Sequence, residues 1–218
     1  MNKKNIALVT GASTGIGEAL SRELVQRGYS VIGLARSLDK LTNMKNELGS
    51  TFIPIVCDVS SKLDIEKASQ QISKQNLCPS IFFLNAGMAG EKVIENPNAF
   101  KLEMHEKIMA VNYFGVLAFI ECWEKLCQEN GGANFIVTSS VNAIFAAPTG
   151  SAYCASKAAI SKAFESLSLT YFGTNLKFSS IYTGPVATDG LKGNWPFTWK
   201  PEKMAKYMSR CLLSVLSR

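Results

Sequence analysis

Six short apolar runs alternate with amphipathic helical patterns along the sequence, and this alternation restricts the fold more than any other feature. Between the runs, apolar residues recur at helical spacing, as Ile16, Leu20 and Leu24 do. Strands that each lead into a helix predict one parallel, doubly wound α/β sheet with helices on both faces. The six runs cover residues 5–10, 29–35, 51–57, 79–84, 134–138 and 176–182.

The composition fits a single domain with a large buried core. A chain of 218 residues is long enough for this, and we expect residues 1–218 to form one domain. The charged fraction of 18% suits central strands that are buried on both faces. Although the net charge is +6, the lysines and arginines are scattered, so we expect no nucleic-acid-binding surface.

Cysteine spacing and hydropathy exclude several other classes. The six cysteines form no C-x-x-C pair and His105 is the sole histidine, so we expect reduced thiols and no metal site. No signal peptide precedes the first run, and no run approaches the length of about 20 residues that spans a bilayer, so we expect a cytoplasmic protein. For the amphipathic last helix, at about 201–217, covering the core is favoured over lying on a membrane.

The first run ends in a glycine-rich turn, TGASTGIG at residues 10–17, before a helical pattern. Gly11 allows a tight turn, Gly15 lets a phosphate approach backbone N–H groups, and Gly17 permits close packing on the strand. Because a helix N-terminus favours an anion, this context predicts phosphate binding. The same stretch matches G-x-S-x-G with Ser13 as a hydrolase nucleophile. That alternative ranks lower, because only one strand precedes it and His105 is the sole candidate base.

The ends of the second and third runs carry residues that suit an adenosine. Arg36 and Ser37 follow the second run, and no acidic residue occurs before Asp39. An Arg at this place can receive a 2′-phosphate, which favours NADP over NAD, whereas a surface Arg that caps the strand is the alternative. Asp58 ends the third run, where it could accept a bond from an adenine amino group or cap the next helix.

Polar residues also follow the fourth and fifth runs. The turn Asn85-Ala86-Gly87 ends the fourth run, on the side of an open sheet where ligands collect. Asn112 lies in the middle of a helix predicted over 101–129, an unfavourable position unless its side chain binds something. Ser140 follows the fifth run.

The next helix, predicted over 152–172, carries Tyr153 and Lys157 one turn apart on the same face. A phenol has a reference pKa of about 10, and a fixed ammonium nearby is expected to lower it. Ser140 could hold a carbonyl oxygen where the phenol can protonate it. A half-buried Tyr beside a surface Lys is the alternative for this pair taken alone.

Together these motifs resemble those of the short-chain dehydrogenases/reductases, in order and spacing, over about residues 5–190. The resemblance implies a Rossmann fold with strand order 3-2-1-4-5-6, a nicotinamide cofactor, and hydride transfer between that cofactor and a carbonyl or alcohol. Tyr153 would be the acid/base, Lys157 would lower its pKa and hold the nicotinamide ribose, Ser140 would polarise the substrate oxygen, and Asn112 would support a proton-carrying water. The expected cofactor-binding residues are Gly11, Ser13, Thr14, Gly15, Ile16, Gly17, Arg36, Ser37, Asp58, Val59, Asn85, Ala86, Gly87, Tyr153, Lys157, Gly184, Val186 and Thr188.

The sequence departs from the family pattern near its end. The usual Pro-Gly after the sixth strand is replaced by Thr183-Gly184, with Pro185 one place later, and we expect no seventh strand. If a homodimer forms, the helices 101–129 and 152–172 are the expected interface. The segment 188–200 is expected to be a substrate lid, whose aromatic residues either contact an apolar or aromatic carbonyl compound or hold the last helix to the domain.

The sequence therefore predicts an NADP(H)-dependent reductase of a small apolar or aromatic carbonyl compound. The alternative is a non-catalytic NADP-binding sensor or interaction module, which would not need Asn112, Ser140, Tyr153 and Lys157 together.

Overall fold

The six predicted strands form one parallel sheet in the order β3-β2-β1-β4-β5-β6, as expected. The computed structural model describes residues 5–89, 101–148, 150–188, 191 and 197–216. The strands are β1 (Ile6–Thr10), β2 (Ser30–Ala35), β3 (Phe52–Val56), β4 (Ile81–Leu84), β5 (Ala133–Ser140) and β6 (Leu176–Thr183). β1 and β4 are buried along their whole length, which explains their continuous apolar sequences.

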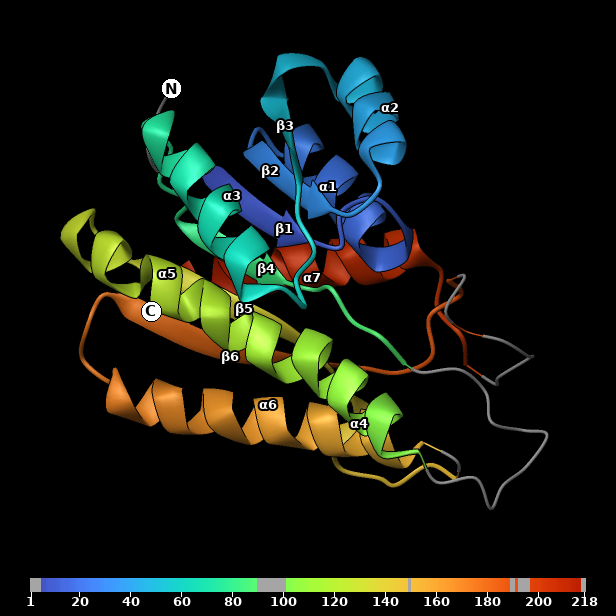
Figure 1. Cartoon of the computed structure of the whole chain (residues 1–218). Helices are drawn as coiled ribbons and strands as arrows, with labels where there is room; N and C mark the ends of the chain where they lie inside the picture. Colours follow the sequence, from blue (N-terminus) through green and yellow to red (C-terminus); the bar gives the residue numbers. More distant parts are fainter. Residues whose placement is uncertain (1–4, 90–100, 149, 189–190, 192–196, 217–218) are drawn as a thin grey trace.

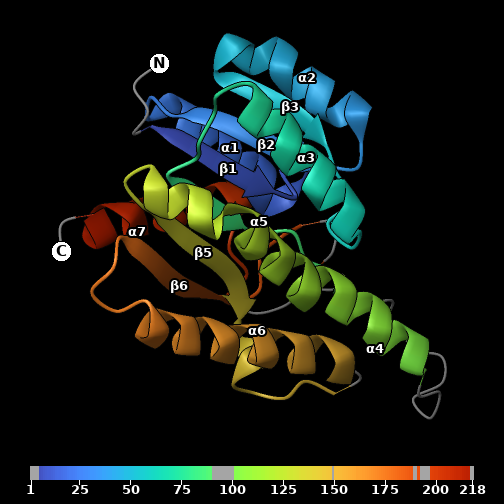
Figure 2. The ribbon, with the colours of Figure 1, turned by 60° about the vertical axis from the view of Figure 1, so that its left-hand side comes forward.

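Helices cover both faces of this sheet (Figures 1 and 2). One apolar cluster joins one face to α3 (Lys62–Lys74), α5 (Gly115–Glu129) and α6 (Ser151–Thr170). A second cluster joins the other face to α1 (Gly15–Gln26), α2 (Leu38–Leu48) and α7 (Pro201–Leu216). Two 3-10 turns lie between these elements: Gly49–Thr51 precedes β3, and Val141–Ala143 follows β5.

The helix predicted over 101–129 contains an irregularity that the sequence did not reveal. It consists of α4 (Leu102–Met109), a π-helical turn (Ala110–Phe114) and α5. A π-helical turn inserts a residue into the helix and is frequent at functional sites. Asn112 lies in this turn, so the local backbone departs from regular helix where the sequence already showed an unfavourable residue.

The aromatic residue Trp199 connects the chain after β6 to α7. Its backbone N–H donates to the Pro185 carbonyl (2.9 Å), and its own carbonyl accepts from the Ala187 N–H (2.8 Å). Its ring meets the ring of Tyr207 edge to face and lies under the ammonium of Lys203. Trp199 therefore holds the last helix to the domain. The rest of the predicted lid, including Trp195, lies largely outside the described residues.

The last helix covers the core, as favoured above. Met204 and Met208 are buried in the cluster with α1, and α7 packs along α1. None of the helices in the described part of the chain combines the length and the apolar character needed to cross a membrane.

Candidate active site

Three strands are tied together at their carboxyl ends by Asn85. Its Nδ2 donates to the Thr10 carbonyl (3.2 Å), and its Oδ1 accepts from the Thr138 hydroxyl (3.1 Å). The Ala86 N–H donates to the Thr10 hydroxyl (3.0 Å). These bonds join β1, β4 and β5, so the Asn85–Gly87 turn lies at the carboxyl edge, where ligands of open α/β sheets bind.

The glycine-rich turn is shaped by two close approaches. At Gly15, which has a φ of 57°, a Cβ would lie 2.9 Å from the methyl of Thr188. At Gly17, a Cβ would lie 2.1 Å from the Gly11 carbonyl oxygen. No side chain fits at either place. Thr14, the residue before α1, makes no side-chain cap, so its side chain leaves the first N–H groups of the helix available to a phosphate.

The carboxamide of Asn112 explains the polar residue in the middle of a helix. Its Nδ2 donates to the Met88 carbonyl and to the Ser156 hydroxyl (both 2.9 Å), and its Oδ1 accepts from the Met88 N–H (2.8 Å). With only 1% of its surface exposed, Asn112 locks the chain after β4 to the π-helical turn and to α6. Its role in supporting a water remains a prediction.

The Lys157 ammonium is buried at the centre of the site. Its Nζ donates to the Thr138 carbonyl (2.6 Å), and the residue is 4% exposed. Burial disfavours the charge and lowers the pKa of Lys157 to about 8. A Cβ at Gly87 would lie 3.4 Å from this Nζ and 3.5 Å from the Asn112 Oδ1. The absence of a side chain at Gly87 therefore leaves space directly above Lys157.

Tyr153 and Ser140 are in direct contact, as the proton-transfer hypothesis requires. Burial raises the pKa of the Tyr153 phenol above its usual value, and the hydrogen bond with Ser140 offsets only part of this rise. The Lys157 Nζ lies over the phenol ring, 5.7 Å from its centroid. The net shift of this pKa is upward because desolvation dominates, and the lowering by Lys157 that the sequence suggested stays a prediction. At neutral pH the phenol keeps its proton and is a donor.

Asp58 does not cap α3, because Ser61 occupies the N-cap and its hydroxyl accepts from the Asp64 N–H (3.2 Å). The Asp58 Oδ1 accepts from the Ser60 N–H (2.9 Å) and from the Ser60 hydroxyl (2.7 Å), in a turn that leads into α3. Burial works to raise the pKa of Asp58, but these bonds and the charge of Arg36 outweigh it and hold the pKa below its ordinary value. Arg36 and Asp58 thus lie near one another at the ends of β2 and β3, while a contact with adenine remains a prediction.

The other expected cofactor residues lie in varied surroundings. The Val59 carbonyl packs against Gly115, where a Cβ would approach it to 2.1 Å. Val186 is buried in the cluster with α7, so its side chain belongs to the core. Thr188 lies beside the glycine turn, as its contact with Gly15 shows.

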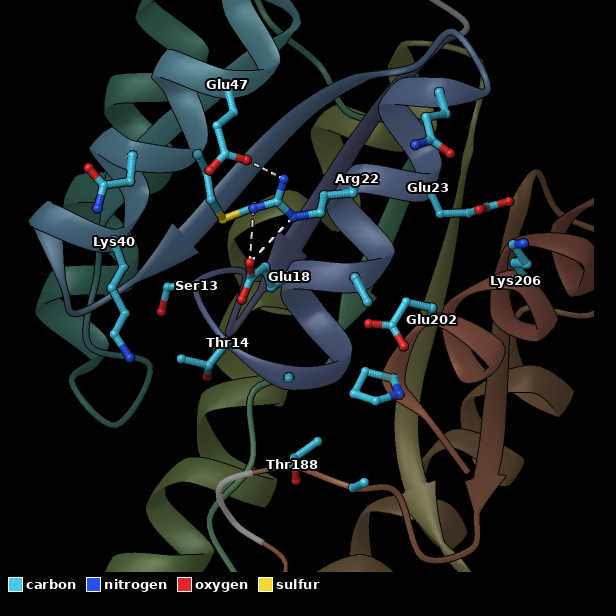
Figure 3. A pocket seen from close by; sticks show the side chains of 17 residues that line it. Ser13, Thr14, Glu18, Arg22, Glu23, Lys40, Glu47, Thr188, Glu202 and Lys206 are labelled. Carbon is cyan, nitrogen blue, oxygen red and sulfur yellow. Dashed lines mark hydrogen bonds and ion pairs between the residues drawn. The ribbon is translucent and has the colours of Figure 1, made fainter. Parts of the chain in front are cut away.

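A polar groove of about 730 Å³ borders the outer side of the glycine turn, between α1, α2 and α7 (Figure 3). Ser13, Thr14 and Thr188 line one end, and the side chain of Lys40 extends toward them from α2. Farther along the groove, Arg22 forms an ion pair with Glu18 within α1 (3.0 Å), and its ion pair with Glu47 joins α1 to α2.

Comparison with known proteins decides the family. The sequence model described as short chain dehydrogenase matches residues 5–197. The chain belongs to the short-chain dehydrogenase family. An uncharacterized oxidoreductase of Mycobacterium tuberculosis is 27% identical over 192 residues, which cover 85% of this chain but 56% of the relative. The chain thus spans little more than half the length of that relative.

Other relatives are of more similar length. A farnesol dehydrogenase of Aedes aegypti is 28% identical over 196 residues, with coverage of 85% of this chain and 79% of the relative. An alcohol dehydrogenase of the archaeon Thermococcus sibiricus, solved with 5-hydroxy-NADP, superimposes with a TM-score of 0.83. It is 27% identical, and the match covers 97% of this chain and 91% of that one.

Sequence reasoning missed two residues that organise the site. Thr138 contacts both Lys157 and Asn85, and Ser156 links Asn112 to the Tyr153 carbonyl (2.8 Å). Thr138 lies two positions before Ser140, and Ser156 lies directly before Lys157. A hydroxyl next to a short-chain dehydrogenase motif residue was the available signal.

The hydrolase alternative gains no support from the geometry. His105 Nε2 lies 3.2 Å from the Ser151 hydroxyl, so the sole histidine of the sequence contributes to the contact between α4 and α6. Ser13 belongs to the glycine turn instead. Among the described residues, no group of three His, Cys, Asp or Glu residues could hold a metal ion, and the six cysteines are reduced.

Proposed function

We propose that this chain is an NADP(H)-dependent reductase that acts on a carbonyl compound. The observation that carries the proposal is the contact of Ser140 with a protonated Tyr153, next to a buried Lys157 and an open surface at Gly87. Family membership supports hydride transfer, and the relatives named as farnesol dehydrogenase and alcohol dehydrogenase act on alcohol groups by name.

The residues of the site divide the reaction between them. When bound, the reduced nicotinamide supplies the hydride to the carbonyl carbon. The Ser140 and Tyr153 hydroxyls hold the carbonyl oxygen, and Tyr153 donates its proton as negative charge develops there. Burial lowers the pKa of Lys157 to about 8, so it is suited to return a proton to Tyr153. The glycine turn and the Asn85–Gly87 turn would hold the pyrophosphate and the nicotinamide ribose.

The preference for NADP rests on cations around the adenosine end. Arg36 is exposed at the end of β2, and Ser37 begins α2 without making a side-chain cap. Lys40, one turn farther along α2, extends toward Ser13 and Thr14 and adds a second positive charge (Figure 3). The two cations, Arg36 and Lys40, together with the Ser37 hydroxyl suit a 2′-phosphate, which NAD lacks.

The direct test measures binding and turnover separately. The purified protein should bind NADPH more tightly than NADH, and equal affinities would refute the argument from Arg36. Tyr153→Phe should abolish reduction across a panel of ketones and aldehydes but leave NADPH binding nearly unchanged. Tyr207→Phe, on the exposed surface of α7, is the control. Firm NADPH binding without turnover of any carbonyl would favour the alternative of a non-catalytic sensor.

We further propose a homodimer through the helices on one face. Phe114 in the π-helical turn, and Leu169 and Phe172 at the end of α6, expose large apolar side chains on the elements that the sequence predicted as an interface. Sedimentation velocity should detect a dimer that Phe172→Asp weakens. A monomer at all concentrations would refute this proposal without affecting the activity.

A further inference from the structure

The segment that follows Ser140 exposes large apolar side chains beside the site. It runs from the 3-10 turn Val141–Ala143 to the start of α6. Ile144 is 67% exposed and Phe145 is 69% exposed, and Val141 is also partly open to solvent. Adjacent exposed apolar side chains of this size mark a binding surface more often than a neutral stretch of loop.

This segment is held in place at both ends. The Asn142 N–H donates to the Ser140 hydroxyl (3.1 Å), and the Phe145 N–H donates to the Val141 carbonyl (2.9 Å). At the other end, the Ala147 N–H donates to the Cys154 sulfur (3.4 Å), next to Tyr153. The segment therefore connects Ser140 to the start of α6, where Tyr153 lies. Its apolar side chains stay exposed although its backbone is fixed.

The segment after Ser140 offers no counter-charge to a charged substrate. From Ser139 to Ser156 the sequence contains no Asp, Glu, Lys, Arg or His. A substrate with a carboxylate or a phosphate close to its carbonyl would find no counter-charge on this segment. The cost of burying an unpaired charge then disfavours such a substrate. An alkyl or aromatic group would instead bury apolar area against Ile144 and Phe145.

We infer that Ile144 and Phe145 form the substrate-selecting surface, on which the non-reacting part of an uncharged alkyl or aryl ketone or aldehyde rests. This inference depends on the proposed reductase activity, and it assigns the substrate class and two specificity-determining residues to that site. The side chains act by contact with the substrate chain, so they should affect KM and chain-length selectivity more than the chemical step.

The test uses a series of methyl ketones of increasing alkyl length with saturating NADPH. Each added methylene that reaches the surface should raise kcat/KM by up to about fourfold, since burying one methylene contributes about 0.8 kcal/mol. Ile144→Ser and Phe145→Ser should flatten this increase through higher KM values for the long ketones. Their kcat/KM should fall least with the shortest ketone, and their NADPH affinity should match the wild type. Leu63→Ser, at an exposed apolar residue of α3, is the matched control.

The outcomes separate this inference from the proposed function. Turnover with a chain-length dependence that neither variant changes would overturn the inference alone, as would a preference for 2-oxo acids over neutral ketones. Loss of a dimer in Phe145→Ser, with the ketone series unchanged, would assign the surface to a second copy and also overturn it. Absence of turnover with every carbonyl compound would overturn the proposed function and the inference together.

Discussion

Ser156 provides the sharpest test of how the site is held together. Its side chain is completely buried, with 0% exposed. The hydroxyl donates to the Tyr153 carbonyl (2.8 Å) and accepts from the Asn112 Nδ2 (2.9 Å). Ser156 therefore connects the π-helical turn to the helix that carries Tyr153 and Lys157. The perturbation is Ser156→Ala, which removes one oxygen and both bonds and adds no bulk.

The two lost bonds differ in cost. The Tyr153 carbonyl retains the helical bond expected from the residue four positions later, so the loss of the Ser156 donor costs little. One Asn112 N–H, by contrast, loses its acceptor in a buried site, which costs about 1–3 kcal/mol. We expect Ser156→Ala to lower the free energy of unfolding by about 2 kcal/mol. Because Asn112 also positions Met88, NADPH affinity and kcat should decrease as well.

Urea unfolding of a matched set checks this value. Ser161→Ala is the control, since its buried hydroxyl lies 2.6 Å from that of Ser139 and makes no bond to Asn112. Its stability should fall by about 1 kcal/mol, with unchanged NADPH affinity. In the Asn112→Ala background, Ser156→Ala should cost about 1 kcal/mol less than in the wild type. Equal effects of the two serine variants on NADPH binding, or a coupling near zero, would refute the reasoning.

Two further predictions concern the glycine turn and the buried lysine. Gly17→Ala places a methyl 2.1 Å from the Gly11 carbonyl oxygen, so it should lower the free energy of unfolding by about 1–3 kcal/mol or more and abolish NADPH binding. Urea unfolding and calorimetry measure the two effects, and Gly184→Ala, where a methyl meets no atom within 4 Å, is the stability control. A fully stable Gly17→Ala would contradict the prediction. Burial lowers the pKa of Lys157 from 10.5 to about 8, so between these pH values the unfolded chain binds a proton that the folded chain has released. Relative to Lys157→Met, the wild type should therefore gain up to roughly 3 kcal/mol of stability as the pH rises through this window, whereas a constant difference would refute the assignment.

The sequence alone determined the sheet and the position of the site. Alternating apolar runs and helical patterns are local periodicities, and short connections between parallel strands leave few topologies. The glycine turn was also readable from the sequence, because the positive φ angles at Gly11 and Gly15 are local backbone requirements that glycine meets. Strand ends then placed Asn85 and Ser140 near one edge, since parallel strands direct their carboxyl ends to the same side.

Only the tertiary structure decided the properties that depend on distant residues. The pKa of Tyr153 rises because burial outweighs the hydrogen bond with Ser140, and burial is set by the whole fold rather than by a spacing of four residues. The π-helical turn at Asn112 accompanies bonds to Met88 and Ser156, 24 and 44 positions away. In the same way, Trp199 holds α7 because of contacts that helical periodicity does not encode. Local patterns specify elements, whereas desolvation and side-chain partners arise only when those elements pack.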